Sequence, residues 1–340
     1  MLIPVLLFLV GLLFLIKGGD WFVDGATGIA ERFHLPELLI GATVVSIGTT
    51  LPEVMVSATS AVSGHSEIAY GNAIGSIICN TSLISAITIA VRPGKVSRKS
   101  LTLPICFFFA AALFYAGVAY STGAFTRWTG ILLLLLFAVY MVATVRQMTV
   151  SESAGGELGQ AVPERNLEST AEDASDRADD KGNSSIVKEI ILLIAGAVLI
   201  AIGADLLVDN GTLIAEALGV PESVIALTFV ALGTSLPELV TAITSLVKGH
   251  GALSLGNVIG ANLFNLVLVC GISITLNPFR IPVSSTLFGY NASLVLDLPV
   301  MFAVMLILTV PALIRQKLYR VQGILLLAIY ASYCAIQFTM

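Results

Sequence analysis

The stretch GTTLPEV at Gly48–Val54 recurs as GTSLPEL at Gly233–Leu239, and each copy places one glutamate inside a long apolar run. Glu53 and Glu238 stand 185 positions apart (238 − 53 = 185), and the same offset relates the flanking sequence without a gap. Roughly two in five of positions 18–80 are identical to their partners. Further matched pairs are Asp20 with Asp205, Asp24 with Asp209, Glu31 with Glu216, Glu37 with Glu222, His65 with His250, Asn72 with Asn257, and Asn80 with Asn265. Such a repeat, with ionisable and proline residues at membrane depth, predicts a transporter whose binding site lies between two halves.

The composition is that of a membrane protein. Apolar residues make up 56% of the chain, charged residues make up 11%, and the mean hydropathy is +0.95. Soluble domains carry about a quarter charged residues, so the chain is predicted to lie in the lipid bilayer. The net charge of −5 does not indicate nucleic acid as a partner, because most of the acidic excess lies in one polar segment. The apolar N-terminus, residues 2–16, lacks a basic leader and a cleavage site, which favours a first transmembrane helix over a signal peptide.

Ten segments are long and apolar enough to span a bilayer, which takes about 20 residues. They are about 2–27, 37–62, 68–90, 103–120, 128–146, 187–213, 222–247, 253–277, 293–314 and 321–339. Residues 147–186 are rich in Gly, Ser, Asp and Glu and cannot form a core, so they are predicted to be a flexible linker. The fold expected is an all-α integral membrane protein of ten transmembrane helices, with five in residues 1–146 and five in residues 187–340.

The distribution of basic residues predicts the orientation, because basic residues near helix ends stay in the cytoplasm. Three basic groups share one side only if the N-terminus is outside; they are Arg92, Lys95, Arg98 and Lys99, then Arg146 and Lys188, then Arg315, Lys317 and Arg320. The opposite loops carry little more than Arg127 and Arg280. An odd number of helices in each half then gives the two repeats opposite orientations, which is the inverted-repeat plan, with the linker in the cytoplasm.

A polar stripe runs through each motif helix. In the first copy Thr43, Ser46, Thr50, Glu53, Ser57 and Ser60 advance by three and four positions. In the second copy the stripe is Thr228, Ala231, Ser235, Glu238, Thr241 or Ala242, and Ser245. Such stripes face the bundle interior or water and not lipid. Each motif proline removes an amide, so Pro52 with Gly48, and Pro237 with Gly233, are expected to loosen the helix and free carbonyls for an ion.

The next helix of each half offers a complementary polar face. Asn72, Ser76 and Asn80 are spaced by four, and Asn257, Ala261 and Asn265 match them, with Asn262 beside Ala261. Two carboxylates with hydroxyls, amides and free carbonyls form an all-oxygen set. That set suits hard cations such as Ca²⁺ or Na⁺, whereas zinc or copper would favour His and Cys. The competing interpretation, polar residues that only hold helices together, is weakened by the two copies in register.

The segments GATVVSIGTTLPE…GNAIGSIICN and ALTFVALGTSLPE…GNVIGANLFN resemble the two alpha repeats of sodium/calcium exchangers, in the cation/calcium antiporter superfamily. The resemblance covers both repeats, and the ten-helix plan extends it over nearly the whole chain. It implies a compact, prokaryotic-type secondary antiporter in the cytoplasmic membrane, with no cofactor, no enzymatic activity and no need to oligomerise. Ca²⁺ and Na⁺ would be its transported ions.

The resemblance also implies roles for individual residues. Glu53 and Glu238 would coordinate Ca²⁺ together with the backbone carbonyls of Thr49 and Thr234. One Na⁺ site would use the backbone carbonyl of Ser46 with Thr49, Ser76 and Glu238. Its pseudo-symmetric partner would use the backbone carbonyl of Ala231 with Thr234, the position of Ala261 and Glu53. Asn80 and Asn265 would line the middle of the site. The first and sixth helices would slide across the other eight.

Three departures from the family pattern bear on the counter-ion. Asn265 stands where many relatives carry Asp, Ala261 removes a hydroxyl ligand, and Ile77 is the counterpart of Asn262. Ca²⁺/H⁺ exchange, or another exchange of a divalent cation for a cation, therefore remains the alternative. An intramembrane enzyme is disfavoured because no catalytic Ser/His or Asp/Asp pattern recurs, and a passive channel would differ in having no need for a counter-ion.

Other polar residues are assigned lesser roles. The four cysteines show no CxxC spacing and are predicted to be small buried apolar residues. His65 and His250 follow glycines in equivalent loops and are expected in turns. Asp20, Asp24, Asp205 and Asp209 are expected near helix ends.

Overall fold

The computed structural model describes residues 2–155, 186–218, 233–283, 286–287 and 289–339. Its helices are α1 Leu2–Arg32, α2 Glu37–Ile40, α3 Ser46–Val62, α4 Ser66–Cys79, α5 Ser85–Val91, α6 Arg98–Thr122, α7 Arg127–Gly155, α8 Ile186–Ala217, α11 Leu236–Lys248, α12 Gly251–Phe264, α13 Cys270–Leu276, α14 Leu298–Arg315 and α15 Arg320–Thr339. Three π-helical turns join consecutive helices of the described chain: η1 Gly41–Val45, η2 Asn80–Ile84 and η4 Asn265–Val269; a further one, η5 Ser293–Asp297, leads into α14. The strands are β1 Ala124–Phe125, β2 Phe279–Arg280, β3 Thr286–Leu287 and β4 Tyr290–Asn291.

Nine segments of the described chain are long and apolar enough to cross a membrane. They agree with nine of the ten predicted spans within a few residues. The remaining prediction, 222–247, lies partly outside the described residues, and α11 forms its C-terminal part. α7 continues as a helix to Gly155, into the segment 147–186 that was predicted to be the linker. The rest of the predicted linker, residues 156–185, lies outside the described residues.

The loops that the charge pattern placed together do meet. β1 pairs with β2 through Ala124 and Arg280, which brings together the loops after α6 and α13. At the other end Lys95 forms an isolated bridge with Lys317, which joins the loops after α5 and α14. Lys95 and Arg280 are equivalent positions of the two repeats, yet they lie at opposite ends of the bundle. The repeats are therefore inverted relative to each other.

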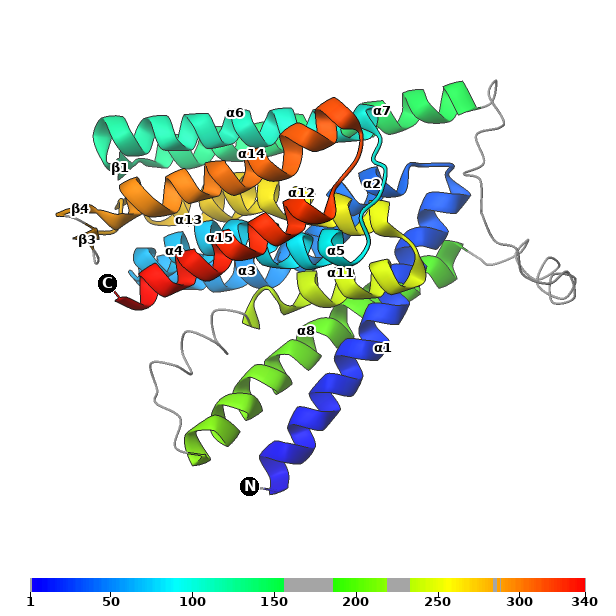
Figure 1. Ribbon diagram of the computed structural model, residues 1–340, viewed down its shortest axis with the longest axis horizontal. Coiled ribbons are helices and arrows are strands. Elements are labelled where there is room, and N and C mark those ends of the chain that lie inside the picture. Colours follow the sequence, from blue (N-terminus) through cyan, green and yellow to red (C-terminus); the bar gives the residue numbers. More distant parts are fainter. Residues whose placement is uncertain (1, 156–185, 219–232, 284–285, 288, 340) are drawn as a thin grey trace, which may run out of the picture.

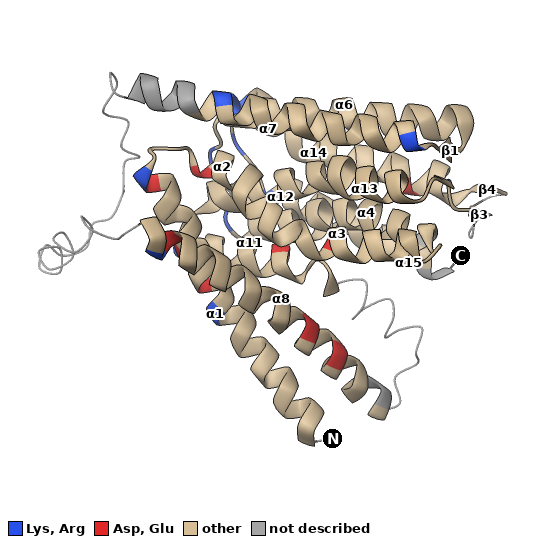
Figure 2. Ribbon diagram, turned by 180° about the vertical axis from the view of Figure 1, so that it is seen from behind, with Lys and Arg blue, Asp and Glu red and all other residues tan. Residues whose placement is uncertain are grey.

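Most basic residues gather at the end of the bundle that holds α2, opposite the end with β1, β3 and β4 (Figure 2). The long middle of each helix carries few charged residues and many exposed large apolar side chains, such as Leu113 at 65% and Ile194 at 59%. An apolar band between charged ends is the surface that a bilayer requires.

α1 and α8 form an antiparallel pair that runs obliquely beside the remaining bundle (Figure 1). Their backbones meet at glycines: a Cβ on Gly18 would lie 2.9 Å from the Gly196 oxygen, and one on Gly11 would lie 2.9 Å from the Gly203 oxygen. Gly11 and Gly196 are repeat equivalents, as are Gly18 and Gly203, so the two contacts are copies of each other. Small residues let the backbones of membrane helices approach closely, so that van der Waals contacts hold the two helices together. α1 and α8 therefore pack along their glycines.

The core of the bundle lies between α4, α6, α7, α12, α13 and α14. Tyr115, Phe125 and Phe264 are among its fully buried side chains, and the rings of Tyr115 and Phe125 stack at 4.4 Å. α12 is the central element, since it contacts η1, α2, α3, α6 and α11. α3, α4, α11 and α12, the motif helices, therefore lie inside the protein, where a polar site is shielded from lipid.

Candidate ion-binding site

The two motif glutamates lie in the interior of the protein. Glu53 belongs to α3 and Glu238 to the first turn of α11, and both are 0% exposed. They interact electrostatically with each other. No oxygen of either carboxylate has a hydrogen-bond partner among the described residues, and neither residue forms a salt bridge there. An unpaired charge at such depth is costly, and buried polar groups of this kind mark functional sites.

The same lack of partners recurs at further pairs of repeat-equivalent residues. The side-chain amides of Asn80 and Asn265 are fully buried, and neither their oxygen nor their nitrogen is bonded within the described residues. The hydroxyls of Thr50 and Ser235 are likewise buried and unbonded there. Because the pattern obeys the 185-residue offset, it reflects the symmetry of the site and not a local packing fault. Thr50 and Ser235 belong to the predicted polar stripes but were not predicted to be ligands.

Two other predicted site residues, Ser46 and Thr49, connect the halves. Ser46 Oγ lies 2.9 Å from the backbone oxygen of Asn257, and Thr49 Oγ1 lies 3.1 Å from Asn257 Oδ1. These bonds run from α3 to α12 and fix the first motif against the second half. Ser46 and Thr49 thus share Asn257 as a neighbour, and the Na⁺ site that the resemblance implied for them stays a prediction.

The first residue of each complementary face supports the motif helix. Asn72 Nδ2 donates to the Glu53 backbone oxygen at 3.2 Å and to Ser57 Oγ at 2.8 Å. In the second half Asn257 has no such hydroxyl, since Ser57 is matched by Ala242, and its Nδ2 is unbonded within the described residues. Asn72 thus holds the backbone of the first glutamate in place.

The remaining predicted residues are placed as follows. Ser76 and Ala261 are buried, at 5% and 0% exposure, and Thr234 is half-buried. Ala231 lies outside the described residues. Asn262, the counterpart of Ile77, donates to Thr81 Oγ1 at 2.7 Å. That bond ties α12 to η2, and Ile77 cannot form the equivalent bond in the other repeat.

The expectation that both motif prolines loosen their helices holds for one copy only. α3 runs unbroken through Pro52, and the irregular backbone lies before it, in the π turn Gly41–Val45. In the second copy Thr234 and Ser235 form a turn, and α11 begins at Leu236 with Pro237 in its first turn. Proline is tolerated in a first turn because no helical partner awaits its missing amide. In α3 the missing amide still leaves the Gly48 oxygen without its usual helical donor.

Asn80 and Asn265 each begin a π turn, η2 and η4. Both lie in otherwise continuous helices, α4–η2–α5 and α12–η4–α13. A π turn holds one extra residue and is frequent at functional sites, because it turns side chains away from the regular helical positions. Sequence inspection did not predict these turns.

The α1–α8 pair lies directly over the site. A small pocket is lined by Phe22 of α1, Ala197 of α8, Thr49 and Pro52 of α3, and Pro237 of α11. The two motif prolines thus face the pair that the resemblance assigns to sliding. A shift of this pair would change what covers Thr49 and the carboxylates behind it.

Ion pairs connect α1 to α11 at the basic end of the bundle. Lys248, at the end of α11, lies 2.8 Å from Asp24 and 3.4 Å from Asp20, both on α1. Asp20 and Asp24 were predicted to lie near a helix end. Their ion pair with Lys248, which is 224 residues from Asp24, was not predicted. The equivalent of Lys248 is Ser63, so Asp205 and Asp209 cannot form the same ion pair at the other end.

His250 forms another contact at the same end. Its Nδ1 lies 2.7 Å from Glu37 Oε1, which connects the turn before α12 with the start of α2. This hydrogen bond with a carboxylate raises the pKa of His250 above its ordinary value of 6.5. His65 and His250 do precede α4 and α12 as their N-cap residues, as the turn prediction expected.

The chemistry available at the site is that of oxygen ligands. The described residues contain no group of three or more His, Cys, Asp or Glu able to hold a metal ion. A cation here would meet two carboxylates, two amide oxygens, hydroxyls and backbone carbonyls. Hard cations bind such sets.

Comparison with known proteins gives the class. The profile of the family described as "Sodium/calcium exchanger protein" matches residues 3–146 and 188–339. The sodium/calcium exchanger MaX1 of Methanosarcina acetivorans is 32% identical over 356 residues, which cover 98% of each chain. The inner membrane protein YrbG of Escherichia coli is 32% identical over 305 residues, 90% of this chain and 89% of that protein. A solved structure of the sodium-calcium exchanger NCX_Mj, soaked with Na⁺ and Sr²⁺, superposes with a TM-score of 0.78, 31% identity and 98% coverage of both chains.

The fold and these matches define a multi-span membrane transporter of inverted-repeat architecture. The chain belongs to the sodium/calcium exchanger family. This family is one of ion exchangers, a class of membrane transporters.

Proposed function

We propose that this protein is a secondary antiporter that exports Ca²⁺ in exchange for Na⁺ by alternating access. The observation that carries the proposal is the pair Glu53 and Glu238, fully buried and without a bonding partner for any of their four carboxylate oxygens among the described residues. When both are ionised the pair has a charge of −2, which one Ca²⁺ or two Na⁺ would neutralise. Charge neutrality matters because an uncompensated charge crosses a low-dielectric barrier only at high cost.

The two ions would share ligands in this proposal. Ca²⁺ would lie between the two glutamates, with the carbonyls of Thr49 and Thr234. Na⁺ would use the backbone carbonyl of Ser46 with Thr49, Ser76 and Glu238 on one side. On the other side it would use the backbone carbonyl of Ala231 with Thr234, the position of Ala261 and Glu53. Asn80 and Asn265 would line the middle. Support comes from the exchanger relatives and from the oxygen-only donor set, and competition for the same carboxylates would couple the two fluxes.

The direction and orientation are part of the same proposal. The protein would lie in the cell membrane with its N-terminus outside and the linker inside, where the basic end of the bundle satisfies the positive-inside tendency. The inward Na⁺ gradient would then drive Ca²⁺ out. With three Na⁺ per Ca²⁺, one net positive charge would cross per cycle, and 100 mV would contribute about 2.3 kcal/mol.

The alternative is Ca²⁺/H⁺ exchange, in which protons on the two glutamates replace Na⁺. It is favoured by Ala261, which supplies no hydroxyl to one Na⁺ site. A flux assay separates the two. Purified protein in liposomes is given ⁴⁵Ca²⁺ outside, with either an outward Na⁺ gradient or a pH gradient of equal driving force.

Uptake driven by Na⁺ alone is the expected result, and a K⁺/valinomycin potential should alter its rate. Uptake driven only by the pH gradient would replace the proposal with the proton alternative. Equilibration of ⁴⁵Ca²⁺ without any counter-ion would indicate a channel. Flux that ignores the valinomycin potential would exclude the three-to-one stoichiometry.

A further inference from the structure

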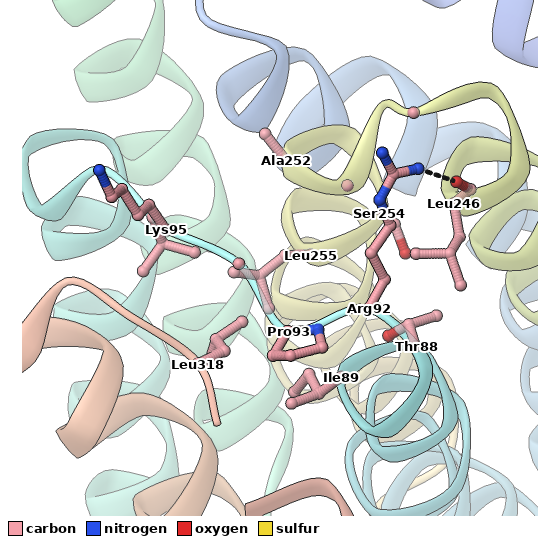
Figure 3. Close-up of a pocket in the computed structure, with 14 residues that line it drawn as sticks. Thr88, Ile89, Arg92, Pro93, Lys95, Leu246, Ala252, Ser254, Leu255 and Leu318 are labelled. Carbon is pink, nitrogen blue, oxygen red and sulfur yellow. Dashed lines mark hydrogen bonds between the residues drawn. The ribbon is translucent and has the colours of Figure 1, made fainter. Parts of the chain in front are cut away.

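A hollow of about 240 Å³ opens at the basic end of the bundle, away from the glutamates. It lies between the end of α5 with its following loop and the turn from α11 into α12 (Figure 3). One part of the hollow is lined by Arg92, Ser254 and the first turn of α12, and Lys95 lies toward its other end. Leu255 and Leu318 contribute apolar wall between them.

The polar groups around this hollow are hydrogen-bond donors that the protein leaves free. Arg92 Nη1 donates to the Leu246 oxygen at 3.3 Å, and this is the one bond of the guanidinium among the described residues. Ser254 is 2% exposed, yet its Oγ has no partner within the described chain. α12 begins at Gly251 without a side-chain cap, because the His250 side chain bonds to Glu37 instead. A guanidinium, a free hydroxyl and an uncapped helix N-terminus together form an anion site.

The other repeat shows that these donors are not required by the fold. Arg92 is matched by Asn277, whose amide donates to the Ala61 oxygen at 2.9 Å and lies 3.4 Å from Ser66 Oγ. Ala61 is the counterpart of Leu246, so the interhelical bond itself is common to both halves. Ser254 is matched by Ala69. The arginine and the serine are therefore additions at the basic end only.

The position of the hollow indicates the source of the anion. It lies at the end of the spanning helices, and beside it Val91 and Val247 are exposed at 63% and 78%, as expected for side chains facing acyl chains. The described residues that line the hollow include no acidic side chain. Basic pockets between transmembrane helices at the membrane surface recognise phosphate headgroups, and arginine matches phosphate oxygens in a forked geometry.

We propose that this hollow binds the phosphate headgroup of an anionic phospholipid, held by Arg92, Ser254 and the N-terminus of α12. The phosphate accepts hydrogen bonds from the guanidinium and the serine hydroxyl. The acyl chains lie along the apolar surface to which the exposed side chains of Val91 and Val247 belong. The lipid then bridges α5 to the α11–α12 turn. This turn directly follows Lys248, which forms the ion pair with α1.

The test is a lipid titration of the full-length protein in a neutral detergent, with the apparent melting temperature as the readout. Phosphatidylglycerol is the probe, and phosphatidylcholine and inorganic phosphate are parallel arms. Ser254→Ala places at position 254 the residue that the other repeat already has there, so it is the substitution least disruptive to folding. Arg92→Gln removes the charge. Arg98→Gln, an exposed residue that does not line the hollow, is the matched control.

The expected result is saturable stabilisation of the wild type and of Arg98→Gln by phosphatidylglycerol alone. Apparent affinity should fall about tenfold or more in Arg92→Gln and a few-fold in Ser254→Ala, as charge-assisted hydrogen bonds predict. Equal titrations in Ser254→Ala, Arg92→Gln and wild type would overturn the proposal. Equal stabilisation by phosphatidylcholine would remove the phosphate-anion specificity, and full stabilisation by inorganic phosphate would make the free anion the ligand.

Discussion

Substituting Gly196 with alanine should weaken the packing of α8 on α1, and the structure gives a measure of the effect. A Cβ at this position would lie 2.7 Å from Phe22 Cα and 2.8 Å from the Gly18 oxygen, and still closer to the Phe22 nitrogen. Carbon atoms in contact are ordinarily about 3.5–4.0 Å apart. All three neighbours are backbone atoms of the opposite helix, so no side-chain rotation can relieve the overlap.

The helices must therefore separate locally by about 1 Å, which forfeits dispersion contacts along the pair. Overpacking of this kind costs about 1–3 kcal/mol. Replacement of a helical glycine by alanine would by itself gain up to about 1 kcal/mol, so a net loss requires the clash. We expect the apparent melting temperature of Gly196→Ala in detergent to fall by several degrees, about 2–4 °C per kcal/mol.

Gly117→Ala is the matched control. Gly117 is an exposed helical glycine of α6, and apart from the nearby backbone of its own helix no atom of the described residues lies within 4 Å of where its Cβ would be. This variant should melt at or slightly above the wild-type temperature. Equal melting temperatures of Gly196→Ala and Gly117→Ala would show that the backbones of α1 and α8 do not meet as closely as described.

Three further predictions follow from the ion pairs and the altered Na⁺ site. Lys248→Gln removes the ion-pair partner that lies 2.8 Å from Asp24, so a cysteine placed at the basic end of α1 should react faster with a thiol reagent. Unchanged labelling would mean that the ion pair does not hold α1. His250→Asn should lower the melting temperature most at acidic pH, because a raised pKa means that the contact with Glu37 stabilises fully below about pH 6.5 and is lost as the pH rises through the folded pKa; a difference independent of pH between 5.5 and 9 would argue against it. Ala261→Ser restores a hydroxyl beside the proposed Na⁺ site and should lower the Na⁺ concentration for half-maximal Ca²⁺ flux by a few-fold; an unchanged value would exclude position 261 from that site.

Much of the architecture could be predicted from the sequence because it depends on local or repeated features. A run of about 20 apolar residues is sufficient to define a spanning helix, and nine such helices lie where hydropathy put them. The 185-residue offset paired Glu53 with Glu238, and a polar stripe within an apolar helix predicted that each of them faces the protein interior. Both residues are indeed buried together in the interior.

Features that depend on tertiary contacts could not be predicted in the same way. A proline predicts a missing amide but not where the helix ends, so α3 passes through Pro52 whereas α11 starts just before Pro237. The π turns at Asn80 and Asn265 have no sequence signal as clear as a proline. Lys248 and Asp24 are 224 residues apart, and only the oblique course of α1 brings them together.

Direct measurement of Ca²⁺ binding by the two glutamates tests the central claim. A carboxylate and a divalent ion about 4 Å apart attract each other by about 8 kcal/mol at an effective dielectric near 20. Even after partial replacement by the amide oxygen of glutamine, the loss should be several kcal/mol, or about a thousandfold or more in affinity. Equilibrium ⁴⁵Ca²⁺ binding to purified protein should be saturable in the wild type and in Glu31→Gln, an exposed acid on α1, and undetectable in Glu53→Gln and Glu238→Gln of normal elution profile. Wild-type Ca²⁺ affinity in either of those two variants would contradict the account.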